Sequence, residues 1–187
     1  MQSIIETFKR IGNLSEENEE ALLRTIKRKE YPPRTILQKQ DKISDKIYFV
    51  EKGSARTYYY KEGKDITYWI ALENDFVGSM SSFFMREPSN KIVETIESCI
   101  LWDFEYEKLE ALFSSNREME KTGRLYANYA ISLLEKRFDD LHFNTAKERY
   151  EILINRQPEV IQRVPLGMIA SYLGITQETL SRIRTQV

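Results

Sequence analysis

The sequence predicts an α+β protein in which a β-rich middle is followed by a long helix and two short closing helices. Three observations predict this class. Short apolar and β-branched runs fill residues 34 to 104, helical periodicity is unbroken from 116 to 141, and a glycine interrupts two short apolar segments near the end. Short strands separated by turn residues are typical of an antiparallel sandwich or barrel. With 187 residues, the chain can bury a hydrophobic core without disulfides.

The N-terminal segment is predicted to be helical up to about Lys29. Its apolar residues share one helical face: Ile4, Ile5, Phe8 and Ile11. Ser15 can cap a second helix whose first turn is acidic. Pro32 and Pro33 then end the helical stretch, because proline cannot continue a helix.

The predicted strands lie in six runs of sequence, which are TIL, KIYFVEKG, SARTYYY, DITYWIAL, KIVETIES and CILWDF. Turn residues separate these runs. Residues 61–65 are predicted to form a hairpin loop in which Gly63 supplies a positive φ.

The segment 116–141 contains no proline and carries two apolar stripes, which suggests two packing partners. The first stripe has the alternating spacing of 3 and 4 residues that coiled coils use, and it is the predicted dimer interface: Met119, Thr122, Tyr126, Tyr129 and Leu133. The second stripe runs beside it: Ala130, Leu134, Phe138 and Leu141. A helix buried within one monomer is the alternative.

The closing helices are defined by local signals. Pro165 suits the first position of a helix, Gly174 can adopt the left-handed conformation that ends it, and Thr176 can cap the next one. On the second helix, one face is predicted to be buried: Thr176, Leu180, Ile183 and Val187. Its predicted contacts on the first helix are Ile169, Ala170 and Leu173.

The opposite face of the last helix is polar, and two short helices joined in this way form a helix-turn-helix. Arginine, glutamate and glutamine can pair with base edges in the DNA major groove, and a helix N-terminus suits a phosphate. The predicted DNA-contacting residues are therefore Thr176, Gln177, Glu178, Ser181, Arg182 and Thr185. The alternative is a charged face that is merely solvated.

Composition excludes several other classes. Cys99 is the only cysteine and His142 the only histidine, so a metal site or cupin-type enzyme built on clustered histidines is not expected, nor is any cofactor. No apolar run approaches the ~20 residues that span a bilayer, and no secretory signal is visible, so a cytoplasmic location is expected. From Asn144 onward six basic residues face four acidic ones, a net +2, whereas the preceding residues carry 22 basic and 25 acidic, a net −3.

Four motifs resemble the Crp/Fnr superfamily of bacterial transcription regulators: LSEENEEALL, IYFVEKGSARTYY, DFVGSMSSFF and IASYLGITQETLSRIR. The resemblance covers nearly the whole chain. It implies a cyclic-nucleotide-binding-like jelly roll within residues 1–115, a dimerisation helix over 116–143, and a winged helix-turn-helix domain over 144–187. The chain ends directly after the last helix, so the strands that usually follow are expected to be absent or very short.

The effector pocket departs from the family pattern. Family members that bind cyclic AMP have a glutamate after Phe-x-Gly and an arginine later in the cassette, whereas this chain has Ser79 and the pair Ser89-Asn90. The hydroxyls expected from the dimer helix are replaced by Leu134-Glu135. We therefore predict no physiological cyclic AMP binding. The cassette holds either another small effector or none, and its candidate contacts are Gly78, Ser79, Met80, Ser81, Ser82, Ser89 and Asn90.

The leading hypothesis is a homodimeric, sequence-specific transcription regulator that is not an enzyme. Two recognition helices related by a two-fold axis would require an inverted-repeat operator in double-stranded DNA. The competing hypothesis is a sensory or protein-interaction module whose helix-turn-helix does not function. The weak +2 charge of the C-terminal part and its short end keep this alternative open.

Overall fold

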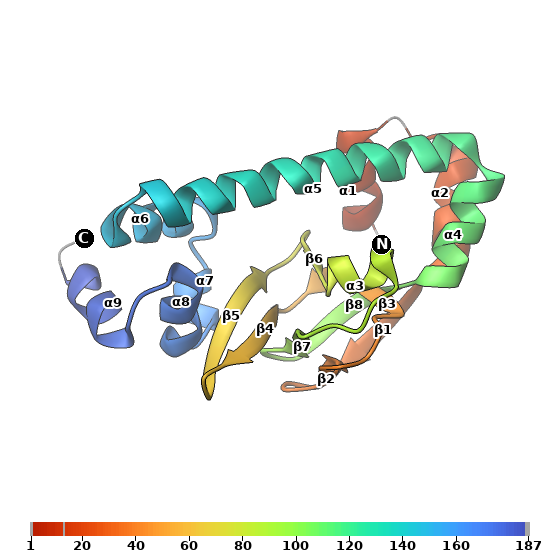
Figure 1. Ribbon diagram of the computed structural model, residues 1–187. Coiled ribbons are helices and arrows are strands. Elements are labelled where there is room, and N and C mark those ends of the chain that lie inside the picture. The colour runs from red at the N-terminus through yellow and green to blue at the C-terminus, as the bar shows by residue number, and fades with distance from the viewer. Residues whose placement is uncertain (1, 13, 186–187) are drawn as a thin grey trace.

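The computed structural model describes residues 2–12 and 14–185. Helices from the N-terminal part of the chain lie beside a β-rich body. The long helix α5 (Arg117–Phe143) crosses this body and leads to a small helical unit at the C-terminal end (Figure 1). The helices of the body and the crossing helix are α1 (Gln2–Ile11), α2 (Glu16–Thr25), α3 (Met80–Met85), α4 (Tyr106–Ser115) and α5 (Arg117–Phe143).

Two antiparallel sheets of four strands each form the body, in the orders β1-β8-β3-β6 and β2-β7-β4-β5. The strands are β1 (Lys27–Tyr31), β2 (Ile36–Gln38), β3 (Lys46–Lys52), β4 (Ala55–Lys61), β5 (Lys64–Ala71), β6 (Phe76–Val77), β7 (Ile92–Thr95) and β8 (Cys99–Glu105). Residues from both sheets share one buried cluster, among them Val50, Ala55, Val93 and Leu101. The predicted antiparallel sandwich is therefore confirmed.

The N-terminal helical prediction is wrong beyond Thr25. Ile26 is extended, with φ −96° and ψ 159°, and β1 follows at Lys27. Every residue of β1 pairs with β8, from Lys27 opposite Asp103 to Tyr31 opposite Cys99. The four residues before Tyr31 are exposed, so KRKEY has no apolar alternation to mark it as a strand. Its conformation depends on the distant partner strand.

Two local predictions are confirmed. Gly63 has a φ of +76° in the turn between β4 and β5. Ser15 caps α2, since its hydroxyl accepts the backbone N–H of Asn18 at 3.4 Å. Both features depend on neighbouring residues alone, which is why the sequence shows them.

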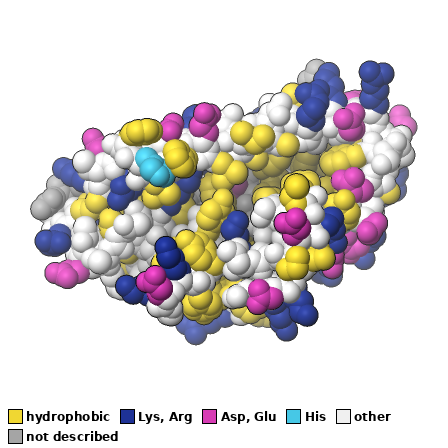
Figure 2. All heavy atoms as spheres, in the orientation of Figure 1, with side chains coloured by type: hydrophobic (Ala, Val, Ile, Leu, Met, Phe, Trp, Pro, Cys, Tyr) yellow, Lys and Arg dark blue, Asp and Glu magenta, His cyan; other side chains and the backbone are white. Residues whose placement is uncertain are grey.

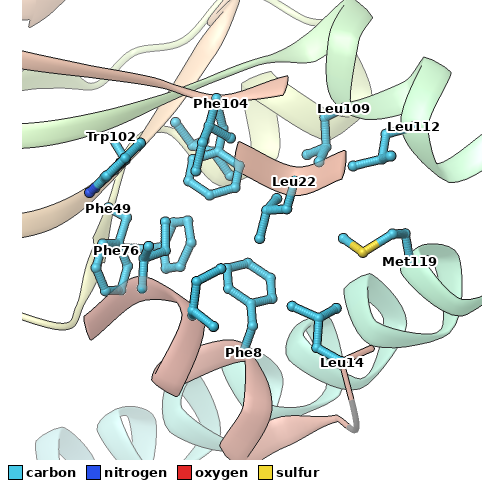
Figure 3. Packing of buried hydrophobic residues seen from close by; sticks show 14 of the residues in the cluster. Phe8, Leu14, Leu22, Phe49, Phe76, Trp102, Phe104, Leu109, Leu112 and Met119 are labelled. Atoms are coloured by element: carbon cyan, nitrogen blue, oxygen red, sulfur yellow. The ribbon is translucent and has the colours of Figure 1, made fainter. Parts of the chain in front are cut away.

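A large core cluster lies between the N-terminal helices and the outer face of the first sheet. Figure 3 shows Phe8, Leu14 and Leu22 converging with Phe49, Phe76, Trp102 and Phe104 from the strands, and with Leu109, Leu112 and Met119 from α4 and α5. Phe8 stacks on Phe104 with ring centroids 6.2 Å apart. The N-terminal half of α5 is thereby fixed to the body of its own chain.

The C-terminal unit is built from α6 (Ala146–Arg156), α7 (Val160–Arg163), α8 (Leu166–Leu173) and α9 (Gln177–Arg184). Residues 144–185 contain no strand, so the expected wing is not seen in this described part of the unit. A further core cluster joins these helices to Ile70 of β5 and to Leu72 just beyond it. The unit therefore packs directly on the edge of the second sheet.

Candidate nucleic-acid interface and effector site

A tight turn joins α8 to α9. Gly174 has φ 68° and ψ 33°, and its N–H donates to the carbonyl of Ser171 at 3.0 Å. Thr176 caps α9, because its hydroxyl accepts the N–H of Thr179 at 3.1 Å. Both predictions are confirmed. Pro165 lies one position earlier than expected, at the N-cap with ψ 135°, and α8 begins at Leu166.

The inner face of α9 is buried as predicted. Leu180 and Ile183 are 1% and 7% exposed and belong to the same cluster as Ile169, Ala170 and Leu173. Thr176 is exposed rather than buried, because its hydroxyl serves as the cap. Val187, which was placed on the same face, lies outside the described residues.

The outer face of α9 is open to solvent. All six predicted DNA-contacting residues are exposed: Thr176, Gln177, Glu178, Ser181, Arg182 and Thr185. The Arg182 guanidinium makes one long hydrogen bond, 3.5 Å from Nη2 to Oγ1 of Thr179, and among the described residues it forms no ion pair. A base or phosphate could therefore reach the Arg182 guanidinium by replacing this one long hydrogen bond.

Arg163 of α7 ties the C-terminal unit to the body. Its guanidinium binds Glu73 in the loop after β5 through two bonds of 2.7 Å and Glu97 in the turn before β8 through bonds of 2.7 and 3.0 Å. A further bond of 2.9 Å joins it to Glu159. We call these four residues the Arg163 clasp. Sequence reasoning missed it, since no local signal brings Glu73, Glu97 and Arg163 together.

The charges of the clasp stabilise each other. The hydrogen bonds that Arg163 donates, to Glu73 above all and then to Glu97, raise the pKa of its guanidinium further above the ordinary value. Burial by itself would raise the pKa of Glu73, but hydrogen bonds from Arg163 and from the N–H of Gly53 hold that pKa below its ordinary value. Both shifts favour the charged forms of Arg163 and Glu73.

The first helix of the helix-turn-helix lies against β5. The hydroxyl of Ser171 accepts the N–H of Thr67 at 2.8 Å and donates to the carbonyl of Asp65 at 3.2 Å. On the other side, the Arg137 guanidinium of α5 stacks 3.7 Å from the centroid of the Tyr172 ring. These contacts and the Arg163 clasp give α8 and α9 a defined orientation relative to the body.

The predicted dimer stripe on α5 faces the chain's own core in its first half. Met119 and Thr122 are 0% and 2% exposed, and the Tyr126 ring stacks 5.8 Å from Phe8. In the single chain these side chains are buried or partly covered by α1 and β6, so this half of the stripe packs within its own chain. Tyr129 and Leu133 continue the same stripe beyond the body, where they line a cavity.

A second apolar face of α5 is exposed. Figure 2 shows hydrophobic side chains gathered along the ridge of this helix, close to the histidine. The exposed residues of this face, here called the α5 ridge, are Ile131 (64%), Leu134 (43%), Phe138 (57%) and Leu141 (39%). Leu134, Phe138 and Leu141 belong to the second of the two stripes seen in the sequence.

The buried hydroxyls of the effector cassette form hydrogen bonds to other groups of the protein. The hydroxyls of Ser79 and Ser89 lie 2.7 Å apart, and both residues are buried. Ser82 Oγ accepts the N–H of Ser44 at 2.9 Å and donates to the carbonyl of Glu87.

The other candidate residues of the cassette do not converge on one point. Ser81 and Asn90 are exposed, Met80 packs against the large core, and a Cβ on Gly78 would lie 2.8 Å from Ile47. The structure thus brings two of the seven candidates together, Ser79 and Ser89, and a third, Ser82, bonds to Ser44 and Glu87 instead.

Comparisons with known proteins agree with this architecture. Residues 28–116 match the family model of the cyclic nucleotide-binding domain. The cAMP-activated global transcriptional regulator CRP of Escherichia coli is 25% identical over 167 residues, which is 82% of this chain and 78% of the relative. The corresponding protein of Salmonella typhimurium is 22% identical over the same shares of both chains.

Solved structures show the same fold. FixK2 from Bradyrhizobium japonicum superposes with a TM-score of 0.67 at 23% identity, covering 86% of this chain and 83% of that one. The c-di-GMP responsive global regulator CLP from Xanthomonas campestris gives a TM-score of 0.64 at 20% identity, covering 92% and 91%. The resemblance is thereby confirmed at the level of the fold: residues 28–116 match the cyclic nucleotide-binding domain, and the chain is similar in sequence to CRP and shares the fold of CLP and FixK2.

Two features are absent from the described residues. None of their helices combines the length and the apolar character needed to cross a bilayer. Over the same part of the chain, no three histidine, cysteine, aspartate or glutamate side chains lie close enough to hold a metal ion.

Proposed function

We propose that the protein is a homodimeric, sequence-specific DNA-binding regulator of transcription, acting in the cytoplasm and not as an enzyme. The observation that carries this proposal is the α8–α9 unit, with its buried inner face and its solvent-exposed polar outer face. Such a unit places its second helix in the major groove. The Crp/Fnr architecture supports the proposal independently.

The side chains of α9 divide into two groups by the contacts they could make. The capped N-terminus at Thr176 and Gln177 points free N–H groups outward and suits a DNA phosphate. Glu178 and Arg182 lie one turn apart on the exposed face, where they can reach base edges. Glutamate accepts from cytosine N4, and arginine donates two hydrogen bonds to guanine. Arg182 is thus the best candidate for sequence discrimination.

A second copy of the chain is the proposed occupant of the α5 ridge. A symmetric contact of two α5 helices buries this apolar face and orients two α9 helices about one axis. The half-sites would then lie ~34–36 Å apart on one side of the duplex, so the operator should be an inverted repeat.

Replacing Arg182 by alanine is expected to lower the preference for the operator over random DNA by ~1–3 kcal/mol. The physical reason is the loss of a bidentate contact to a base, while the fold stays intact because the side chain is exposed. Fluorescence anisotropy on a fragment from upstream of the protein's own gene, across salt concentrations, measures the change.

Arg184→Ala is the matched control, because it removes the same charge from α9 beside rather than within the outward stripe. This variant should weaken binding to the operator and to random DNA about equally. If the two variants lose operator preference equally, Arg182 does not read a base. If wild type binds neither DNA at low salt, the alternative of a sensory module with a silent helix-turn-helix gains support.

The internal hydrogen bonds of Ser79, Ser82 and Ser89 support the absence of physiological cyclic AMP binding. The missing glutamate and arginine would each supply a charge-assisted contact of ~1.5–3 kcal/mol, so affinity should fall by roughly 10²- to 10⁴-fold. Calorimetric titration should therefore show no binding at micromolar cyclic AMP, with the Escherichia coli relative as positive control. Micromolar affinity would contradict this prediction.

A further inference from the structure

A cavity of about 840 Å³ lies where the body and the C-terminal unit meet under α5. Its walls come from the end of α1, the loop 72–75, the middle of α5 and the turn 156–159. The volume is within the ~300–1,000 Å³ that is usual for small-molecule sites, and such sites prefer domain junctions. The cavity is separate from the serine cassette, none of whose seven candidate residues lines it.

Two arginines in the lining of the cavity can bind an anionic group. Two of its carboxylates, Glu73 and Glu159, are already bound by Arg163. Arg10 and Arg156 also line the cavity, and among the described residues neither guanidinium pairs with a carboxylate. The Arg10 guanidinium donates a hydrogen bond to the Thr7 hydroxyl at 3.2 Å. Both guanidiniums can therefore bind an anionic ligand, although the charge of Arg156 also acts on Asp75 in the same lining.

The α5 wall of the cavity is aromatic. The rings of Tyr126 and Tyr129 meet edge to face with centroids 6.1 Å apart, and Tyr129 is 47% exposed. A planar group can pack on such rings, and an arginine beside it can stack as well. The tyrosines lie on a different face of α5 from Ile131, Leu134 and Phe138, so a partner helix on the α5 ridge would leave the cavity open.

Asp75 lines the same cavity and links it to the interior of the body. One of its oxygens accepts the N–H of Phe76 at 2.8 Å and the other accepts the Trp69 indole N–H at 3.2 Å. Burial raises the pKa of Asp75 to about 6, although the hydrogen bond from Phe76 and the charge of Arg156 act against burial. A carboxyl group with a raised pKa in a cleft is typical of a binding site.

We propose that this cavity binds a small organic anion with a planar ring. Arg10 and Arg156 hold the anionic group, and Tyr126 and Tyr129 pack on the ring. Arg10 belongs to the body and Arg156 to the C-terminal unit, so the ligand bridges the two parts and stabilises one arrangement of α9 relative to the body. An effect of the ligand on DNA binding rests on the proposed function, whereas binding of the anion in the cavity does not.

Isothermal titration calorimetry of the whole protein without DNA tests the site. The probes are 2-naphthoate, its neutral analogue 2-naphthalenemethanol, and adenosine 5′-monophosphate as a phosphate-bearing alternative. We expect one site per chain for 2-naphthoate or for the monophosphate, and the better probe distinguishes a carboxylate from a phosphate ligand. The neutral analogue should bind at least ~10-fold more weakly.

The affinity for the anion should fall at least ~10-fold in Arg156→Ala, and it should also fall in Tyr129→Ala. Arg184→Ala, which removes an exposed arginine far from the cavity, should leave binding unchanged. Equal affinity in wild type and Arg156→Ala, or no binding of either anion at millimolar concentration, would overturn the proposal. Because this measurement contains no DNA, failure of the regulator function would not change its result.

Discussion

Replacing Leu134 and Phe138 together by aspartate is expected to turn the dimer into a monomer and to lower operator affinity at least ~100-fold. Both side chains are exposed in the single chain, at 43% and 57%. Burying a large apolar side chain contributes ~1.5–3 kcal/mol, and a two-fold interface contains each residue twice. Like charges that face each other across the axis add repulsion. Sedimentation equilibrium measures the association, and anisotropy measures the loss of DNA affinity.

Ser132→Asp is the control for this experiment, because Ser132 is exposed on the same helix but outside the apolar ridge. That variant should remain dimeric and bind DNA. A wild-type protein that sediments as a monomer, or a double variant that stays dimeric, would refute α5 as the interface. The single chain of the double variant should still fold, since the replaced side chains are exposed and not part of the core.

Replacing Gly53 by alanine is expected to cost at least ~3 kcal/mol of the free energy of unfolding. Gly53 has a φ of +99°, a region that an alanine enters only with strain of about 1–3 kcal/mol. A Cβ there would also lie 2.5 Å from the carbonyl oxygen of Ser98 and 2.7 Å from the sulfur of Cys99. The turn between β3 and β4 would have to move away from β8. Urea denaturation measures this loss.

The same substitution should disturb the Arg163 clasp. The N–H of Gly53 donates to Oε1 of Glu73 at 2.8 Å, and the same oxygen accepts from Arg163. A shifted turn therefore moves a carboxylate that orients the C-terminal unit. Gly63→Ala provides the control: its φ of +76° carries a similar strain, but no atom lies within 4 Å of the added Cβ. That variant should lose only about 1 kcal/mol. Equal losses in the two variants would show that the close approach to Ser98 is unimportant.

Local signals were sufficient for most of the candidate DNA-binding unit. The αL residue Gly174, the cap at Thr176 and the periodicity of Leu180 and Ile183 all act within one or two helical turns. Such signals can be recognised in the sequence without knowledge of the rest of the fold, because they depend on short segments only. The hairpin at Gly63 was predictable for the same reason. The outward direction of Arg182 then follows from the inward direction of its neighbours.

For the long helix α5, local signals do not specify which apolar stripe is buried. Periodicity identified two apolar stripes on α5, but it gave no reason to prefer one as the buried stripe. Met119 and Thr122 are buried because α1 and the outer face of the first sheet reach them, and these elements lie far away in the sequence. The remaining stripe became the candidate dimer interface only when its neighbours were known.

The sequence by itself determined the α+β class, most of the strands and the helix-turn-helix, since turns, caps and apolar periodicity are properties of short segments. Only the tertiary structure decided the strand β1, the exposed face of α5, the Arg163 clasp and the cavity beneath α5. Each of these features depends on a contact between distant segments, such as Lys27 with Asp103 or Arg163 with Glu73. A pattern of residues can specify which face is apolar or charged, but the partner of that face is set by how the whole chain packs.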